Sequence, residues 1–406
     1  MDETPTPRRV WDVFQAFLVQ GLTAFGGPVA HLACFRREFV ARRGWLSEAA
    51  FADLLALAQF LPGPASSQLG MAIGLRRAGY FGLLAAGLGF ILPAGAAMIG
   101  LAYLAPQVTA VWGRGFLHGL QIAAAAVVLQ ALIGMARALA VGPIRSGIAV
   151  GAAAGLLIAQ GPVAQILALC AGGLFGLLML REPPSAPDAA LAPAPEDSAT
   201  RDVPVAVPMI ALGTFVLLLG LAPFLAGLLD SPMLGLASVI YRTGALAFGG
   251  DHVLLPLLQG EIVSRGWLDQ QSFLAGYGAV QALPGPLFSF AGFVGAAQTV
   301  AAGGWRGGLT ALGAIFLPSL LLVAGVLPFW DRLKTLPGAR AVLAGVNAAV
   351  VGVLAAALWN PMLATAMQRP GDWALAAGAF VFLFVAGLPP WIVVVGLGVL
   401  TGVFTP

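Results

Sequence analysis

One block of this sequence occurs twice. The segment Gly21–Pro28 reads Gly-Leu-Thr-Ala-Phe-Gly-Gly-Pro, and Gly244–Asp251 reads Gly-Ala-Leu-Ala-Phe-Gly-Gly-Asp. Farther along, Gly-Trp-Leu at residues 44–46 recurs at 266–268, and the Gln59–Pro64 segment recurs as Gln281–Pro286. The offset is 223 residues at first (244 minus 21) and 222 at the end (286 minus 64). Because the copied glycines and prolines interrupt helices rather than fill a core, the chain repeats a broken-helix arrangement.

The composition excludes a soluble protein. Hydrophobic residues make up 59% of the 406 residues and charged residues only 9%, which is too few to cover a surface that faces water. We therefore predict an all-α integral membrane protein of about 13 transmembrane segments, since ~20 apolar residues cross the hydrocarbon. The expected segments are 11–34, 49–75, 80–104, 115–139, 146–160, 162–180, 207–229, 233–258, 271–302, 306–328, 340–360, 373–386 and 388–405.

The predicted domains are two homologous repeats, 1–180 and 231–406, joined by a linker (181–206) and a connecting transmembrane helix (207–230). Residues 181–204 hold six prolines and five acidic residues, which is typical of a disordered linker. Six crossings and then the connecting helix would deliver the second repeat from the opposite side, so the repeats are predicted to be inverted. If residues 49–75 dip in and return instead, the count becomes odd and the repeats parallel.

The positive-inside rule leaves that choice open. Arg36, Arg37, Arg42 and Arg43 precede the 49–75 segment, and Arg76 and Arg77 follow it. Both groups can be cytoplasmic only if the segment re-enters.

The breaks carry the candidate chemistry. Two glycines and a proline release one helix and start another, and a helix that begins inside a membrane presents unpaired N–H groups that attract anions. Irregular backbone at that depth must be buried in protein or line a cavity, so we expect the breaks to converge on a cavity. The candidate substrate-binding residues are Phe25, Gly26, Gly27, Pro28, His31, Gln59, Pro62, Gly63, Pro64, Ser66, Ser67, Phe248, Gly249, Gly250, Gln281, Pro284, Gly285, Pro286 and Ser289.

Each candidate also has a structural interpretation. Gln59 and Gln281 could tie helices together, and the serines could bond the carbonyls of their own helix. Pro93 and Pro318 are read as kinks, and Asp53 is expected to face headgroups or pair with an arginine. Asp251 and His252 are candidates for proton coupling, because they follow the second Phe-Gly-Gly.

The sequence offers no cofactor or metal site. Cys34 and Cys170 lack ligand spacing, three histidines make no convincing metal centre, and no catalytic motif is present. We expect no enzyme activity and no nucleic-acid partner. The expected partners are an oxyanion and the lipid bilayer, with a homodimer possible.

The ordered motifs resemble a known family. The run Phe25 to His31, then Trp45-Leu46, then Pro62-Gly63-Pro64, with their second-half echoes, is similar to the chromate ion transporter family in its long-chain form. The resemblance implies a bacterial inner-membrane protein that exports chromate and confers chromate resistance, with sulfate as a competing anion. The family's motif residues fall on Phe25, Gly26, Gly27, Pro28, His31, Pro62, Gly63 and Pro64.

One position departs from this pattern, because Asp251 stands where the first repeat has Pro28. An ionised carboxylate would repel a dianion, so the second break is expected to be structural or to handle protons. The alternatives to chromate export are a proton-coupled importer of sulfate or another oxyanion, a membrane-embedded enzyme, and a structural or assembly factor.

Overall fold

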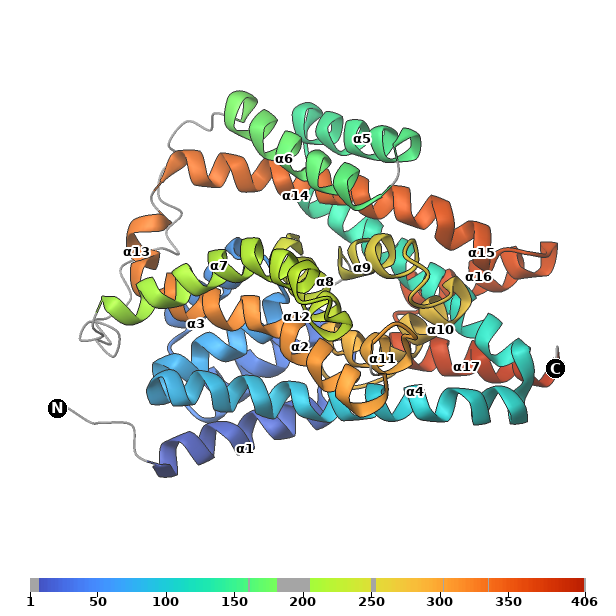
Figure 1. Ribbon diagram of the computed structural model, residues 1–406, viewed down its shortest axis with the longest axis horizontal. Helices are drawn as coiled ribbons and strands as arrows, with labels where there is room; N and C mark the ends of the chain where they lie inside the picture. Colours follow the sequence, from blue (N-terminus) through green and yellow to red (C-terminus); the bar gives the residue numbers. More distant parts are fainter. Residues whose placement is uncertain are drawn as a thin grey trace.

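The computed structural model describes residues 7–159, 161–180, 205–249, 253–301, 303–334 and 336–404. Every regular element in these ranges is a helix, which confirms the all-α prediction (Figure 1). Most of the predicted linker (181–204) and the residues Gly250, Asp251 and His252 lie outside the described ranges, as do the side chains of Pro28 and Val29.

The first repeat and the connecting segment form seven helices and one π-helical turn. They are α1 (Pro7–Thr23), α2 (Gly27–Phe35), the π-helical turn Arg36–Arg42, α3 (Glu48–Phe60), α4 (Ala65–Leu139), α5 (Pro143–Ile158), α6 (Pro162–Met179) and α7 (Ala206–Leu228). The long α4 is not straight, because the backbone leaves helical geometry at Ala78, Gly79 and Gly113. It therefore acts as three helices in succession.

The second repeat repeats this order in shorter elements. They are α8 (Pro232–Leu246), α9 (Leu254–Ile262), α10 (Gln270–Val280), a 3₁₀ turn (Leu287–Ser289), α11 (Phe290–Ala297), α12 (Gly304–Val326), α13 (Trp330–Leu333), α14 (Pro337–Ala357), α15 (Ala364–Ala366), α16 (Pro370–Phe384) and α17 (Pro390–Phe404). A 3₁₀ turn (Leu327–Phe329) and a π-helical turn (Leu358–Leu363) complete it.

The segment 11–34, predicted as one crossing, is a hairpin. The ring of Phe17 in α1 stacks on Phe39 beyond α2, with centroids 4.6 Å apart, and meets Phe35 edge-on at 5.4 Å. In a continuous helix, residues 17 and 39 would be ~33 Å apart. The chain reverses because Gly26 and Gly27 both adopt positive φ angles.

The segment 49–75 also folds back. Arg76, near the end of the first part of α4, lies 3.5 Å from the carboxylate of Asp53 near the start of α3. The guanidinium groups of Arg43 and Arg77 both lie 5.1 Å from the centre of the Trp45 ring. The arginine clusters before and after this segment therefore lie together at the same end of the hairpin, as the re-entrant interpretation required.

The second repeat folds back at the equivalent places. Arg242 of α8 forms an ion pair with Glu261 of α9, so the predicted span 233–258 is also a hairpin. Phe290 of α11 packs edge-on against Phe273 of α10 with ring centroids 5.1 Å apart, which shows the same for 271–302. Four segments predicted as single crossings are thus hairpins. The prediction was wrong because two short arms joined by a break contain as many apolar residues as one crossing helix.

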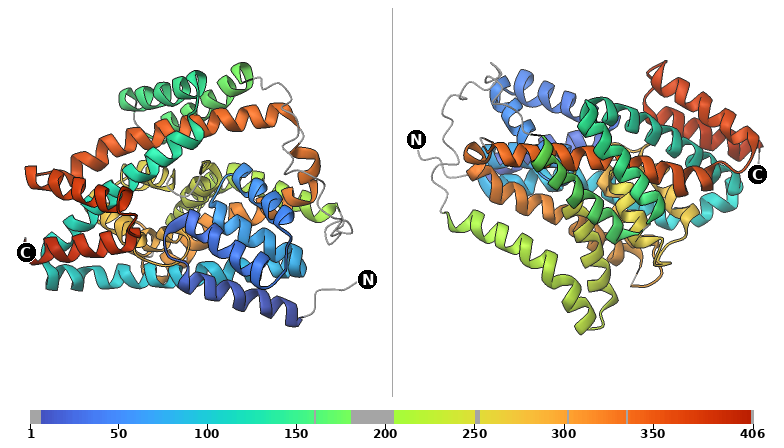
Figure 2. Two further views of the ribbon diagram at one scale, coloured as in Figure 1. Left: turned by 180° about the vertical axis from the view of Figure 1, so that it is seen from behind. Right: turned by 90° about the horizontal axis from the view of Figure 1, so that it is seen from above.

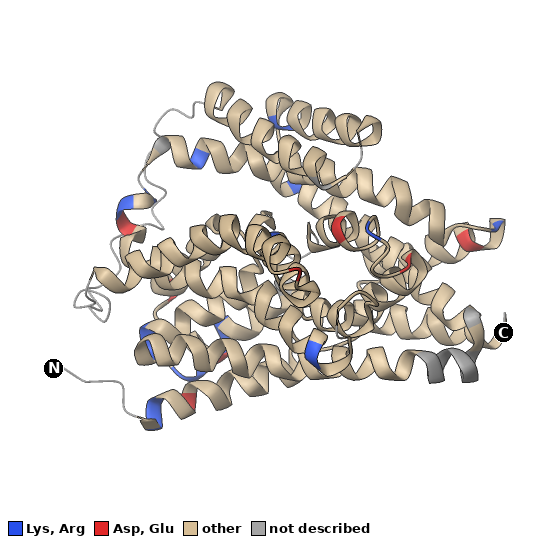
Figure 3. Cartoon of the chain, in the orientation of Figure 1, with Lys and Arg blue, Asp and Glu red and all other residues tan. Residues whose placement is uncertain are grey.

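Five stretches of the described chain are long and apolar enough to cross a membrane: Ala65–Ala105, Gly115–Leu139, Ala206–Leu228, Gly304–Leu333 and Gly338–Ala366. Long stretches of the helices carry no charge, as Figure 3 shows. Helix α7 lies at the periphery (Figure 2), and only 6% of its most apolar window is buried in the protein. That exposed apolar surface is what a membrane protein presents to lipid.

Candidate functional site

The four breaks contain glycines that no other residue could replace without strain. The φ angles are +102° at Gly26, +74° at Gly27, +125° at Gly63, +83° at Gly249 and +100° at Gly285. Side chains of L-amino acids rarely tolerate this region, so the chain can turn at these points only because a Cβ is missing. The predicted positions of the breaks are confirmed by this geometry.

The breaks meet in pairs, and each pair joins the two repeats. The backbone N–H of Gly63 donates to the carbonyl of Ala247 at 2.7 Å, which we call the first crossing. The N–H of Gly285 donates to the carbonyl of Ala24 at 3.1 Å, which we call the second crossing. The two contacts are reciprocal, since each joins a Pro-Gly-Pro break to the Phe-Gly-Gly break of the other repeat.

The first crossing is surrounded by buried polar side chains. Gln68 Nε2 donates to the carbonyl of Pro62 at 2.6 Å and to Ser319 Oγ at 3.3 Å. Ser66 and Ser67 are 0% and 1% exposed, and neither hydroxyl has a hydrogen-bond partner among the described residues. These serines therefore do not bond the carbonyls of their own helix, which was the alternative interpretation.

The second crossing holds a histidine. His31 is fully buried, and its Nε2 lies 3.1 Å from the carbonyl of Ala24, which also accepts the Gly285 N–H. The ring stands edge-on to Phe90 at 5.3 Å. Within the described ranges its Nδ1 has no partner, and the same is true of Ser289 Oγ and Gln281 Nε2.

Other predicted residues are not brought into these clusters. Gln59 is exposed, whereas its counterpart Gln281 is buried. Phe25 is 42% exposed, and its ring lies 6.1 Å from that of Trp391. Phe248 is half-buried, as are Pro62 and Pro284, while Pro64, Pro286 and both of their neighbouring glycines are buried.

The donors are enclosed by protein rather than arranged around an open cavity. A groove of about 710 Å³ lies elsewhere, between α5 and α6, and its walls are apolar. The breaks meet in two pairs rather than around the one cavity that the sequence predicted, and the side chains that surround the first crossing are buried. An ion could reach these side chains from outside only if the helices that cover this crossing moved.

Sequence reasoning missed Gln68 and Ser319. Gln68 directly follows Ser67 in the first turn of α4, so its position beside the break was a signal within the sequence. Ser319 gave no such signal, because it follows Pro318, which was read only as a kink. Its contact with Gln68 joins residues 251 positions apart.

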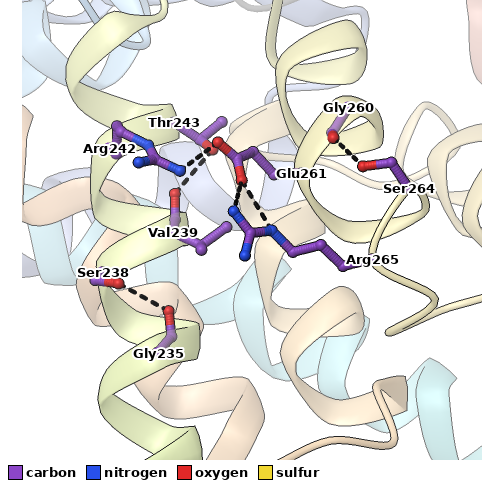
Figure 4. Close-up of polar contacts among 9 residues, drawn as sticks. All are labelled: Gly235, Ser238, Val239, Arg242, Thr243, Gly260, Glu261, Ser264 and Arg265. Carbon is purple, nitrogen blue, oxygen red and sulfur yellow. Dashed lines mark hydrogen bonds and ion pairs between the residues drawn. The ribbon is translucent and has the colours of Figure 1, made fainter. Parts of the chain in front are cut away.

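Charged clusters lie beside the hairpins. Figure 4 shows Glu261 between two guanidinium groups, with Arg242 on one oxygen and Arg265 on the other. In the first repeat, the equivalent Glu38 is held by Arg42 and Arg43. These ion pairs neutralise carboxylates that are 4% and 8% exposed.

A separate cluster links the repeats through Asp53. Its Oδ1 accepts from Trp330 Nε1 at 3.0 Å and from Lys334 Nζ at 3.0 Å, and its Oδ2 faces Arg76. The expected arginine partner is confirmed. Trp330 and Lys334 are additional partners that come from the second repeat.

The chemistry of the crossings suits an anion rather than a metal. Across the described ranges, there is no group of three or more His, Cys, Asp or Glu side chains that could hold a metal ion. Hydroxyl groups and the N–H groups of a helix start are donors, and α4 has no side-chain cap. Such donors in an apolar surrounding bind oxyanions.

Comparison with known proteins places this geometry in context. The family model for chromate transporters matches residues 11–177 and again residues 234–403. A chromate transport protein of Pseudomonas aeruginosa is 33% identical over 97% of this chain and 94% of its own length. The chromate transport protein of Cupriavidus metallidurans is 27% identical over 84% of this chain and 80% of its own length. No solved structure gives a match.

Proposed function

We propose that this chain, which belongs to the chromate transporter family, exports chromate across the bacterial inner membrane and so confers chromate resistance. The observation that carries the proposal is the group of buried donors at the first crossing. Within the part of the chain that the structure describes, the hydroxyls of Ser66 and Ser67 have no partner, and they lie at an uncapped helix start inside an apolar bundle. Buried polar groups are normally satisfied, so these donors are suited to a substrate.

The donor chemistry supports chromate and sulfate as alternative substrates. Hydroxyl and N–H donors respond to negative charge and tetrahedral shape, which these two dianions share. Phosphate near neutral pH carries a proton, and this O–H group would face the hydroxyl and N–H donors of the site. We therefore expect sulfate to compete with chromate, and phosphate or chloride to compete much less.

The membrane potential supports export. A potential that is negative inside works on each charge by ~2.3 kcal/mol per 100 mV, so a leaving dianion gains ~4.6 kcal/mol per 100 mV. No coupled ion is required for export. Uptake of the same anion would have to overcome that free energy.

We further propose that the two repeats, 1–180 and 231–406, have inverted topology. The hairpins add no net crossing, which leaves 80–112, 114–139, α5 and α6 in the first repeat, an even number. Helix α7 adds one crossing between the repeats. Four membrane spans are an even number, as the six predicted from the sequence were, so the connecting helix still inverts the second repeat. The reciprocal hydrogen bonds of Gly63 and Gly285 support this inversion.

Counterflow in vesicles tests the function. Purified protein would be reconstituted with unlabelled chromate inside, and uptake of trace labelled chromate would be followed with and without excess sulfate. We expect counterflow that sulfate suppresses and phosphate does not. Chromate flux that excess sulfate leaves unchanged would contradict a donor site of this kind.

A second candidate function is proton-coupled oxyanion import. It is favoured by His31, whose buried Nδ1 has no partner in the described chain, and by Asp251 and His252 in the sequence. An imposed pH gradient at zero potential distinguishes the two. Accumulation driven by that gradient would support import, and flux that follows the potential alone would support export.

A further inference from the structure

We propose that each chain holds a single oxyanion site, at the first crossing, and that Ser319 of the second repeat completes it. Ser66, Ser67 and Ser319 supply hydroxyl donors, and Gln68 positions Ser319. This inference rests on the proposed function and assigns the substrate to one of two crossings that the duplication makes formally equivalent.

The two crossings differ in the residues that surround them. Offsets of 222 residues after the Pro-Gly-Pro motifs, and of 225 from Pro93 to Pro318, give the equivalent positions. Ser66 corresponds to Phe288, Gln68 to Phe290 and Ser319 to Ala94, and only Ser67 has a polar equivalent, Ser289. Phe288 and Phe290 are fully buried, so aromatic rings occupy the places that Ser66 and Gln68 hold at the first crossing. The second crossing keeps Ser289 of this set, beside His31 and Gln281.

The first crossing also has more backbone N–H donors than the second. The first backbone bond of α4 runs from Gln68 N to the carbonyl of Pro64, so the N–H groups of Ala65, Ser66 and Ser67 precede it. In the second repeat, the chain begins with a 3₁₀ turn in which Ser289 N already bonds the carbonyl of Pro286. Only two N–H groups precede that bond, and the turn has three residues.

Gly63 allows the two repeats to approach each other at this place. A Cβ on Gly63 would lie 2.6 Å from Gln68 Nε2 and would overlap Ser319 Oγ. Because Gly63 has no side chain, both polar groups can reach the break. Ser319 Oγ accepts from Gln68 Nε2, which leaves the serine's own proton available for an acceptor.

Gln68 acts through Ser319. Its amide is held by the carbonyl of Pro62 at 2.6 Å, so the Nε2 group that points to Ser319 is fixed in place. We therefore regard Gln68 as a positioning residue and the three serines as the side chains that contact the anion. Since Ser319 belongs to α12, movement of the second repeat away from α4 removes one donor and weakens the site.

Equivalent serines provide the test. Ser67→Ala and Ser289→Ala remove the same hydroxyl at the two crossings, and each variant would be reconstituted at matched protein amounts. We expect the KM for chromate to rise about 10-fold or more in Ser67→Ala, as for a lost hydrogen bond to a charged group, and less than about 2-fold in Ser289→Ala. Ser319→Ala should raise it similarly, and Ser319→Thr, which keeps a hydroxyl, should restore it.

Ser238→Ala is the control for a buried serine, because the Ser238 hydroxyl donates to the carbonyl of Gly235 in its own helix. Equilibrium binding of labelled chromate should give one anion per chain. Equal losses in Ser67→Ala and Ser289→Ala, or two anions bound per chain, would overturn the single site. Absence of chromate flux in the unaltered protein would instead overturn the proposed function, so the two failures are distinguishable.

Discussion

At the scale of single residues, glycines at the breaks serve in two different ways. Gly27 and Gly63 both have positive φ angles, of +74° and +125°. A Cβ on Gly27 would meet nothing within 4 Å, whereas a Cβ on Gly63 would strike Gln68 and Ser319. Gly27 is therefore needed for backbone conformation alone, and Gly63 for conformation and for close approach of the two repeats.

We predict that Gly63→Ala abolishes transport while the protein still inserts in the membrane. The added methyl group must displace Gln68 and Ser319, and a φ angle of this kind costs a further ~1–3 kcal/mol in a residue with a side chain. Gly134→Ala in α4 is the control, since a Cβ there meets nothing within 4 Å. Flux assays at equal expression decide the matter, and normal flux in Gly63→Ala would show that the first crossing is not required.

A second residue-scale prediction concerns Asp251, which lies outside the described residues. Asp251→Asn keeps the length and capping ability of the side chain but removes its titration. We expect chromate flux in this variant to lose its pH dependence and to keep its substrate preference. A flux profile from pH 5.5 to 8.5 measures this, and an unchanged profile would limit Asp251 to helix capping.

At the scale of elements, each hairpin depends on contacts between its two arms. Phe17 stacks on Phe39 in the first hairpin, and Phe290 meets Phe273 in the last. The hairpin of α8 and α9 uses charge instead, because Glu261 binds Arg242 of the facing helix as well as Arg265. Removing different members of that cluster should have unequal effects on stability.

We predict that Glu261→Gln destabilises the protein more than Arg242→Met does. The first change leaves two guanidinium groups without a carboxylate, at a cost of about 2–3 kcal/mol for this partly exposed cluster. The second leaves Glu261 bound to Arg265 through both Nε and Nη2, at 3.1 and 2.8 Å. Thermal unfolding in detergent measures the difference, and equal melting temperatures would mean that losing Arg242 costs as much as losing the carboxylate of Glu261.

At the scale of the whole molecule, the two repeats are joined at their centres and tied again at one end. At the two crossings, the N–H groups of Gly63 and Gly285 donate to carbonyls of the other repeat. Near the start of α3, Asp53 accepts hydrogen bonds from Trp330 and Lys334. The Asp53 contacts join the first repeat to α13 and to Lys334 just beyond it, so opening at that end must break them. The beginning of α1 and the end of α17 lie at opposite ends of the long axis (Figure 1).

Inverted repeats predict opposite accessibility for equivalent residues. Ala41 and Ser264 are both exposed, and they are 223 positions apart, which is the repeat offset. In a background with Cys34 and Cys170 replaced, a cysteine at Ala41 should react with an impermeant maleimide from one side of the membrane and a cysteine at Ser264 from the other. Reaction of both from the same side would mean that the repeats are parallel.

The membrane class, the duplication and the positions of the breaks could all be predicted from the sequence. Composition determines the solvent that a chain can tolerate, and Gly63 or Pro64 restricts the backbone within one or two residues of itself. These effects are local, so they can be recognised without knowledge of distant contacts. The candidate serines Ser66 and Ser67 were found in the same way, from their place in the first turn after a break.

Only the tertiary structure decided whether a broken segment crosses or folds back, because the apolar length of residues 11–34 satisfies either arrangement. The decision comes from contacts such as Phe17 with Phe39, which depend on how the arms pack. The same holds for the site. Gln68 meets Ser319 across 251 positions, and only the folded chain brings them together, because hydrogen bonds depend on distance in space and not on separation along the sequence.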